Sequence, residues 1–255
     1  MSYSVLNLKH SPFKIKSMKI KLRFIHILFS AIILFSTSLY GQATTGLTPT
    51  QTFDDFLSLV NKGTIKRAIL SEADIKGSPN LNDNFILGTI LTNNKIKYVD
   101  VPLRYNIYND DMEFEVDKNT YLAISNPKSM NEICIGDDVF VYTIKRNKKG
   151  EQFGYYQLLQ KGKVQLLSRY NIVFKEATTT TGYKAPEPAK LERNSNTYYL
   201  QIGTDEPQEI SGKKDIQTIF GSESPKIEAF IKKEKLNVRK EADLIELVKF
   251  INESK

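Results

Sequence analysis

Acidic side chains are the groups in the middle of the chain whose number and spacing suggest acid–base chemistry. Six of them form two groups, one in consecutive or alternating positions and one further along the chain: Asp110, Asp111, Glu113, Glu115, Asp137 and Asp138. Two carboxylates that face each other across a cleft, one protonated and one ionised, can hydrolyse a glycoside. Glu113 and Glu115 alternate with apolar residues, however, which is typical of the solvated face of a strand. The pattern favours this second interpretation, and we assign no catalytic residue.

A loop rich in amide and carboxylate side chains precedes this region. Its oxygen atoms could bind calcium, and they come from Asn80, Asn82, Asp83 and Asn84. The loop lacks the central glycine and the final glutamate of the known 12-residue calcium-binding pattern. We therefore predict no metal site, and no motif in the chain predicts a cofactor.

Histidine and cysteine are too rare for most familiar catalytic sites. The two histidines, His10 and His26, both lie near the N-terminus, and Cys134 is the one cysteine. Residues 42–255 therefore lack the parts of a Ser-His-Asp or Cys-His site and of a His-ligated metal site. Cys134 lies in a short apolar strand pattern, which predicts a buried, unreactive side chain.

The N-terminal segment has the order of parts of a secretory signal peptide. Three cations lie within six residues of Met18, an apolar run extends over residues 24–35, and small polar residues lead to Gly41. Twelve residues are fewer than the ~20 that a membrane-spanning helix needs. We expect residues 1–41 to be a signal peptide, with residues 1–17 as an upstream extension if Met18 is the true start. The expected location is the periplasm, the outer membrane surface or the exterior, with membrane contact only through this transient segment.

Removal of the signal peptide would also remove most of the net positive charge of the chain. The net charge is +7, but residues 42–255 carry 30 cations against 29 anions. A Lys-rich stretch over residues 232–240 is interleaved with glutamates, as on a solvated helix face. We therefore expect no nucleic-acid partner.

Residues 84–175 alternate between apolar and polar side chains with a period of two. Short polar turns divide them into eight predicted strands: 85–92, 96–108, 111–117, 121–125, 132–135, 139–144, 154–160 and 164–174. Connections this short join antiparallel neighbours, so we predict a meander. A sheet of eight strands must curl or be covered, and we expect a strongly curved sheet with helices against one opening or face.

Helical patterns flank these strands. An amphipathic helix is predicted over residues 52–63, capped by Thr52 and ended by Gly63. The Thr- and Pro-rich residues 176–196 are predicted to be a loop or linker. A small unit over residues 197–255 follows, with a hairpin of residues 197–202 and 208–210 and helices near 212–220, 225–236 and 240–253. The predicted fold class is α+β, mainly antiparallel β, with residues 42–175 as its first domain.

Several segments of this pattern resemble an uncharacterised family of exported Bacteroidota proteins. The resemblance rests on GSPNLNDNFILGTI (77–90), VPLRYNIYNDDMEFEV (101–116), GYYQLLQKGKVQLLSRY (154–170) and the helix start at Ser211–Asp215, and it covers roughly residues 77–255. It implies export to the cell envelope, and it implies no activity and no roles for particular residues.

Three functions are compatible with these observations. The one we favour is a non-catalytic envelope protein that binds or scaffolds another macromolecule, either a protein or a polysaccharide. The second is a carrier of a small apolar ligand, lined by some of the 13 Tyr and 14 Phe residues. The third is a carboxylate-dependent hydrolase built on the acidic residues above.

Overall fold

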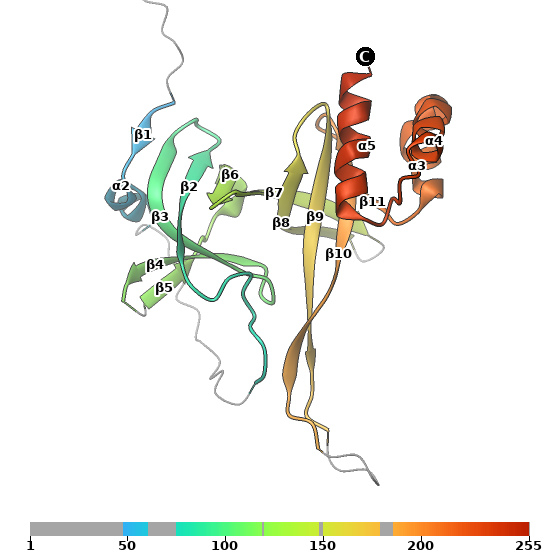
Figure 1. The fold of residues 1–255 in the computed structure, drawn as a ribbon. Coiled ribbons are helices and arrows are strands. Elements are labelled where there is room, and N and C mark those ends of the chain that lie inside the picture. Colours follow the sequence, from blue (N-terminus) through green and yellow to red (C-terminus); the bar gives the residue numbers. More distant parts are fainter. Residues whose placement is uncertain (1–47, 61–74, 119, 148–149, 179–185, 255) are drawn as a thin grey trace, which may run out of the picture. The chain divides into compact units, whose positions relative to one another are not determined.

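The computed structural model describes residues 48–60, 75–118, 120–147, 150–178 and 186–254 (Figure 1). The predicted signal peptide of residues 1–41, including the upstream extension of residues 1–17, lies outside the described residues. The fold class is α+β and mainly antiparallel β, as predicted. Among the described helices, none combines the length and the apolar character that crossing a membrane requires.

One curved, open sheet contains all the strands of the described residues. They are β1 (Thr50–Gln51), β2 (Ile86–Thr92), β3 (Lys97–Asn106), β4 (Asp111–Asp117), β5 (Thr120–Ala123), β6 (Met130–Ile135), β7 (Asp138–Asn147), β8 (Gly150–Gln160), β9 (Val164–Lys175), β10 (Lys190–Ile202) and β11 (Gln208–Ile210). Their order is β11-β10-β9-β8-β7-β6-β2-β3-β4-β5, and β1 pairs with β3 in parallel. All eight strands predicted between residues 84 and 175 are present.

The strand order departs from a single meander at one point. β6 pairs with β2 rather than with β5, so β2–β5 and β6–β11 are two meanders joined side by side. The physical reason lies in the connection after β5, which includes the short 3₁₀ helix η2 (Pro127–Ser129). Because this connection is longer than a hairpin turn, β6 is not held beside β5.

Turn geometry follows from a few residues with positive φ. At the β2–β3 hairpin this residue is Lys95 (φ 62°). Within β3, Asp100 (φ 55°) lies at a β-bulge, where the pairing with β2 shifts by one residue. Gly136 (φ 57°) turns β6 into β7. Glycine and aspartate tolerate this conformation better than most residues.

The helix α2 (Phe53–Val60) packs on the inner face of the first meander. Asp55 accepts hydrogen bonds at its Oδ2 atom from the backbone N–H and the hydroxyl of Thr52, at 3.0 and 2.9 Å. These two bonds close the start of the helix and lower the pKa of Asp55. Phe56 is fully buried and meets Tyr98 and Phe114 edge-on, at ring distances of 5.4 and 5.2 Å. Gly63, the predicted end of this helix, lies outside the described residues.

The C-terminal helices cover one face of the last strands (Figure 1). They are α3 (Lys213–Phe220), α4 (Ser224–Lys233) and α5 (Glu241–Glu253), with the 3₁₀ turn η3 (Gly221–Glu223) between the first two. Leu166 of β9 and Leu200 of β10 share a buried cluster with Leu244 and Leu247 of α5. Asn252 fixes α5 to β9, because its side chain binds both the N–H and the carbonyl of Val164, at 2.9 and 2.8 Å.

The linker predicted over residues 176–196 is wrong in its last part. β10 begins at Lys190, which pairs with Lys175, and the β9–β10 ladder continues to Ile202 opposite Val164. Apart from Leu191, residues 190–196 are polar, so their sequence carries no apolar alternation. Backbone pairing with β9 makes them a strand despite this composition, and the sheet therefore runs through the predicted domain boundary.

Gly88, in the middle of β2, allows close packing of β2 against β6 and β3. A Cβ atom at this position would contact the carbonyl oxygen of Cys134 and lie 2.9 Å from Cδ1 of Leu103. We expect Gly88→Ala to lower the free energy of unfolding by about 1–3 kcal/mol, as overpacked sites do. Urea denaturation measures this change. Gly212→Ala is the matched control because its Cβ would meet no atom within 4 Å, and equal losses in both variants would contradict the packing argument.

Candidate functional site

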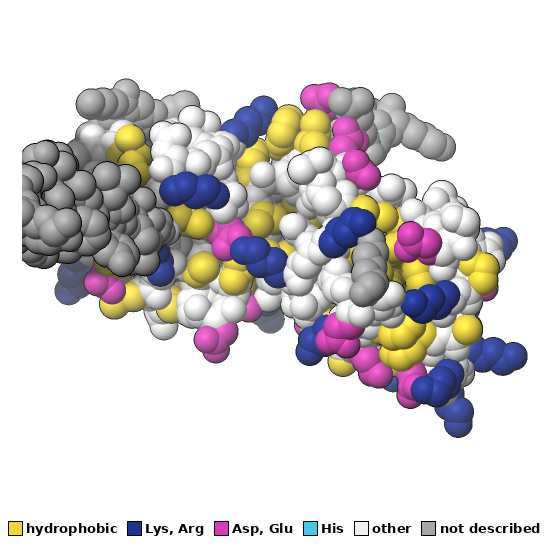
Figure 2. All heavy atoms as spheres, turned by 90° about the horizontal axis from the view of Figure 1, so that it is seen from above, with side chains coloured by type: hydrophobic (Ala, Val, Ile, Leu, Met, Phe, Trp, Pro, Cys, Tyr) yellow, Lys and Arg dark blue, Asp and Glu magenta, His cyan; other side chains and the backbone are white. Residues whose placement is uncertain are grey.

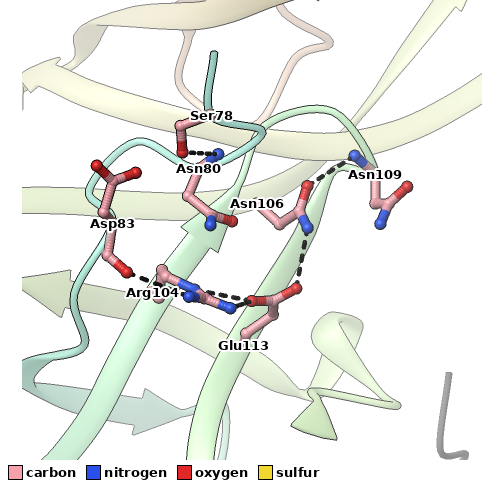
Figure 3. Close-up of polar contacts among 7 residues, drawn as sticks. All are labelled: Ser78, Asn80, Asp83, Arg104, Asn106, Asn109 and Glu113. Atoms are coloured by element: carbon pink, nitrogen blue, oxygen red, sulfur yellow. Dashed lines mark hydrogen bonds and ion pairs between the residues drawn. The ribbon is translucent and has the colours of Figure 1, made fainter. Parts of the chain in front are cut away.

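Glu113 is a buried ion-pair partner, and its predicted place on a solvated face is wrong. Its side chain accepts hydrogen bonds from Nε and Nη2 of Arg104 at 3.0 and 2.7 Å, and from Nδ2 of Asn106 at 3.0 Å (Figure 3). Only 5% of Glu113 is exposed. The face is covered because the guanidinium of Arg104 packs against the rings of Phe85 and Tyr121, 4.4 and 4.7 Å from their centroids.

The loop that could have bound calcium instead attaches two distant strands to each other. Leu81 donates its N–H to the carbonyl of Tyr105 in β3 at 2.8 Å, and Arg193 of β10 donates to the carbonyls of Asn80 and Leu81. The carbonyl of Asp83 accepts from Arg104 at 3.2 Å. Within the described ranges, no three His, Cys, Asp or Glu side chains are grouped as metal ligands would be.

Asp110 connects the β3–β4 turn to β8 and β9. Its Oδ1 atom accepts from the hydroxyl of Tyr105 at 2.7 Å and from the N–H of Tyr155 at 3.2 Å, and its Oδ2 atom accepts from Arg169 at 3.0 Å. Gly154 makes room for this carboxylate, since a Cβ there would lie 2.5 Å from Oδ2. Asp110 itself adopts a positive φ of 57°. Asp110 thus combines an unfavourable backbone conformation with hydrogen bonds from donors on β3, β8 and β9, which gives it a clear structural role.

A small open pocket lies beside Asp110 and has a volume of about 230 Å³. Its walls come from the start of β4, the end of β5 and the segment after it, and the paired strands β7 and β8: Asp110, Asp111, Ala123, Ile124, Ser125, Pro127, Tyr142 and Tyr155. Two of the six acidic candidates are therefore brought together at one pocket. We take this pocket as the candidate functional site.

The other acidic candidates do not line the pocket. Glu113 is in the ion pair described above, and Glu115 lies opposite Tyr121 in the β4–β5 ladder. Asp137 is exposed at the β6–β7 turn, and Asp138 accepts a hydrogen bond from Nε2 of Gln157 at 2.7 Å. Cys134 is half-buried on β6 rather than buried as predicted.

Two tyrosines of the pocket were not anticipated from the sequence. Tyr142 and Tyr155 are directly opposite each other in β7 and β8, and their rings meet edge-on at 4.8 Å. Tyr155 is 2% exposed, and its hydroxyl has no hydrogen-bond partner among the described residues. An unpaired buried hydroxyl costs roughly 1–3 kcal/mol. The register of the β7–β8 hairpin was the signal that could have placed the two tyrosines together.

Burial and nearby carboxylates both raise the pKa values of these two tyrosines. Desolvation raises the pKa of Tyr155 most, and Tyr142, Asp110 and Asp111 raise it further. The pKa of Tyr142 is raised by desolvation and then by Asp110 and Asp111. Both groups therefore remain neutral hydroxyls, able to donate and accept hydrogen bonds, over the whole physiological pH range.

Tyr170, whose ring lies 6.2 Å from that of Tyr105, has a raised pKa. We therefore predict that the folded protein loses stability at alkaline pH. Burial, followed by the charge of Asp138, raises its pKa to about 12. Between about pH 10 and pH 12 an unfolded tyrosine has lost its proton while folded Tyr170 has not, so stability falls as pH rises. We expect urea midpoints to be steady up to about pH 9 and to decrease beyond about pH 10. Tyr170→Phe should weaken this decrease, whereas Tyr108→Phe, at a 45% exposed position, should leave it unchanged. A midpoint independent of pH in this window would contradict the argument.

The Lys-rich C-terminal surface carries both signs of charge. Figure 2 shows Lys and Arg side chains interspersed with Asp and Glu on the visible face. Lys233 and Glu234 form an ion pair at 2.9 Å, which raises the pKa of Lys233. Mixed charge of this kind is typical of a solvated surface.

Comparison with known proteins identifies neither a family nor a similar protein. No family model matches the chain, and neither a curated protein nor a solved structure shows significant similarity to it.

Proposed function

We propose that this chain is a non-catalytic binding protein that holds another macromolecule, a protein or a polysaccharide, through the pocket beside Asp110. The observation that carries this proposal is the size of the pocket, about 230 Å³. Sites that enclose a whole small-molecule ligand usually have volumes of about 300–1,000 Å³. A smaller, open pocket suits one side chain or one sugar substituent of a larger partner.

A carboxylate-dependent hydrolase is the second candidate, because Asp110 and Asp111 line the same pocket. Hydrolysis of a glycoside requires one carboxylic acid that holds a proton and one ionised partner. Asp110 accepts three hydrogen bonds, one of them from the guanidinium of Arg169. These bonds fix its position and occupy both of its oxygen atoms. This arrangement favours binding over catalysis.

The packing of aromatic rings weighs against a carrier of an apolar ligand. Tyr105 lies 5.3, 5.8 and 6.2 Å from the ring centroids of Phe140, Tyr155 and Tyr170. These rings, which come from β3, β7, β8 and β9, contact one another, whereas a carrier would need them to line a cavity. Their arrangement is that of an ordinary core.

The proposal places the protein outside the cytoplasm. Its basis is the sequence of residues 1–41, which has the features of a signal peptide. The partner would then be a component of the cell envelope. The balanced charge of residues 42–255 favours a protein or polysaccharide partner over a nucleic acid.

Affinity capture from an envelope extract tests the proposal. The mature chain and its Asp111→Asn variant serve as baits, and Tyr108→Phe, at an exposed position outside the pocket, is the matched control. We expect the mature chain and Tyr108→Phe to retain one partner at a fixed ratio, and Asp111→Asn to lose it. Recovery of the bait alone, or equal recovery by all three baits, would contradict the proposal.

A further inference from the structure

The hydrogen bonds of the β7–β8 hairpin show which way the backbone groups of its residues point. Directly opposite residues of an antiparallel pair either exchange both backbone hydrogen bonds or exchange none. Tyr155 lies opposite Tyr142, but it donates its N–H to Oδ1 of Asp110 at 3.2 Å. The two tyrosines therefore exchange no backbone hydrogen bond, and the N–H and C=O groups of Tyr142 point away from β8.

The same alternation places the backbone groups of Phe140 and Ile144 on the outer edge of β7, the edge away from β8. β6 occupies this edge at Phe140, which pairs with Ile133, and among the described residues the β6–β7 ladder ends there. No backbone group of the described ranges bonds to Tyr142 or Ile144 on this side. The N–H and C=O groups of both residues are thus open along one edge of the strand.

The outer edge of β7 lacks the features that protect most exposed strand edges. Such edges are usually very short, bulged, or interrupted by charged residues or proline. β5, at one end of the sheet, has 4 residues, and β10 is bulged between Asn194 and Thr197. β7 instead pairs with β8 without a shift of register, and residues 141–144 are Val, Tyr, Thr and Ile, which favour extended structure. The edge is therefore suited to pair with another extended chain.

The pocket beside Asp110 adjoins this edge at Tyr142. Its walls also include residues 123–125 and 127, which belong to the end of β5 and the segment that follows it. Side chains of a strand added to β7 would alternate between the two faces of the sheet, so every second one can point toward this space. The volume of about 230 Å³ suits one such side chain.

We propose that the outer edge of β7 at Tyr142 and Ile144 binds an extended peptide segment of a partner protein, which adds a strand to the sheet and places one side chain in the pocket. Open N–H and C=O groups at strand spacing are matched by another extended polypeptide backbone. A polysaccharide has no backbone that alternates amide donors and acceptors in this way. This inference rests on the proposed binding function and narrows the partner from a protein or a polysaccharide to a protein.

The test uses a phage-displayed library of short random peptides, selected against the mature chain. We expect enriched peptides that, once synthesised, bind the chain saturably. In the complex, hydrogen exchange measured by NMR should become slower at the amides of Tyr142 and Ile144, whereas the amide of Thr143, which points toward β8, should keep its rate. N-methylation of the peptide at every second residue should raise the dissociation constant about tenfold per site, and at the residues between them it should change little.

Proline variants test the same edge from the side of the protein. Ile144→Pro removes an N–H from the outer edge of β7 and none from the β7–β8 ladder, so it should weaken peptide binding about tenfold. Glu151→Pro is the matched control, because the N–H of Glu151, like that of Tyr155, points away from β7. This variant should bind the peptide as the parent does.

Three results would overturn the inference. The first is that no enriched peptide binds the folded mature chain, and the second is that N-methylation shows no alternation. The third is a dimer of the mature chain that Ile144→Pro dissociates, since the edge would then belong to a second copy. If Ile144→Pro fails to fold, the N-methylation series and the amide exchange still decide the matter.

One further outcome separates this inference from the proposed function. A peptide whose binding is lost in Asp111→Asn, but which leaves the amide exchange of Tyr142 and Ile144 unchanged, would bind through the pocket alone. That result would refute strand addition and leave the proposed function standing.

Discussion

Glu113→Ala is expected to lower the free energy of unfolding by about 3–5 kcal/mol, the usual cost of removing one partner of a buried ion pair. Arg104 and Glu113 retain only 13% and 7% of their side-chain exposure. Without Glu113, the guanidinium of Arg104 would remain buried against Phe85 and Tyr121 without the carboxylate that it binds. Urea denaturation at neutral pH measures the loss.

Two further variants distinguish this explanation from a general effect of losing an ion pair. Glu113→Gln keeps the shape and part of the hydrogen bonding, so its loss should be smaller than that of Glu113→Ala. Lys161→Ala breaks the Lys161–Glu132 pair, in which Lys161 is 69% exposed. Exposed pairs contribute little, and this variant should unfold almost as the parent does. Losses of similar size in Glu113→Ala and Lys161→Ala would refute the buried-pair argument.

Asp110→Ala is expected to lower the free energy of unfolding by about 2–3 kcal/mol, because it leaves three donors without their acceptor. The affected donors are the hydroxyl of Tyr105, the N–H of Tyr155 and the guanidinium of Arg169. The expected loss is smaller than for Glu113 because Arg169 and Asp110 keep 25% and 22% of their side-chain exposure. Water can therefore solvate part of the exposed pair.

A double-mutant cycle isolates the bond between Asp110 and Arg169. Residues in one hydrogen-bond network couple by about 0.5–3 kcal/mol, so Asp110→Ala and Arg169→Met together should cost less than the sum of the single variants. Strict additivity would show that the two side chains act independently. It would also remove the structural role that we assign to the bond between Asp110 and Arg169.

The strands were predictable from the sequence because alternation and short turns are local signals. The Met112–Glu113–Phe114 alternation placed β4 correctly, and polar turns placed the hairpins on either side of it. The pairing of β6 with β2 was not predictable in the same way. It depends on where β6 pairs after the connection that follows β5, and no local pattern encodes that choice.

The candidate site was predictable only in part. Asp110 and Asp111 were recognised as acidic candidates, but alternation alone indicated that Glu113 faces solvent. Alternation places polar residues in solvent only where one face of the sheet is exposed. It fails at Glu113 because Arg104 and the loop of residues 78–83 cover the polar face. Tyr142 and Tyr155 come together only through the β7–β8 register. The mainly polar residues 190–196 form a strand by pairing with β9, which their composition did not indicate.

The central claim is that the acidic residues of this protein stabilise the fold and bind a partner without changing it chemically. The most direct test is mass spectrometry of the captured partner before and after prolonged incubation with the mature chain. We predict that the partner stays bound at a fixed ratio and that its mass does not change. Cleavage of the partner by the parent chain, lost in Asp111→Asn, would contradict the claim and establish a hydrolase instead.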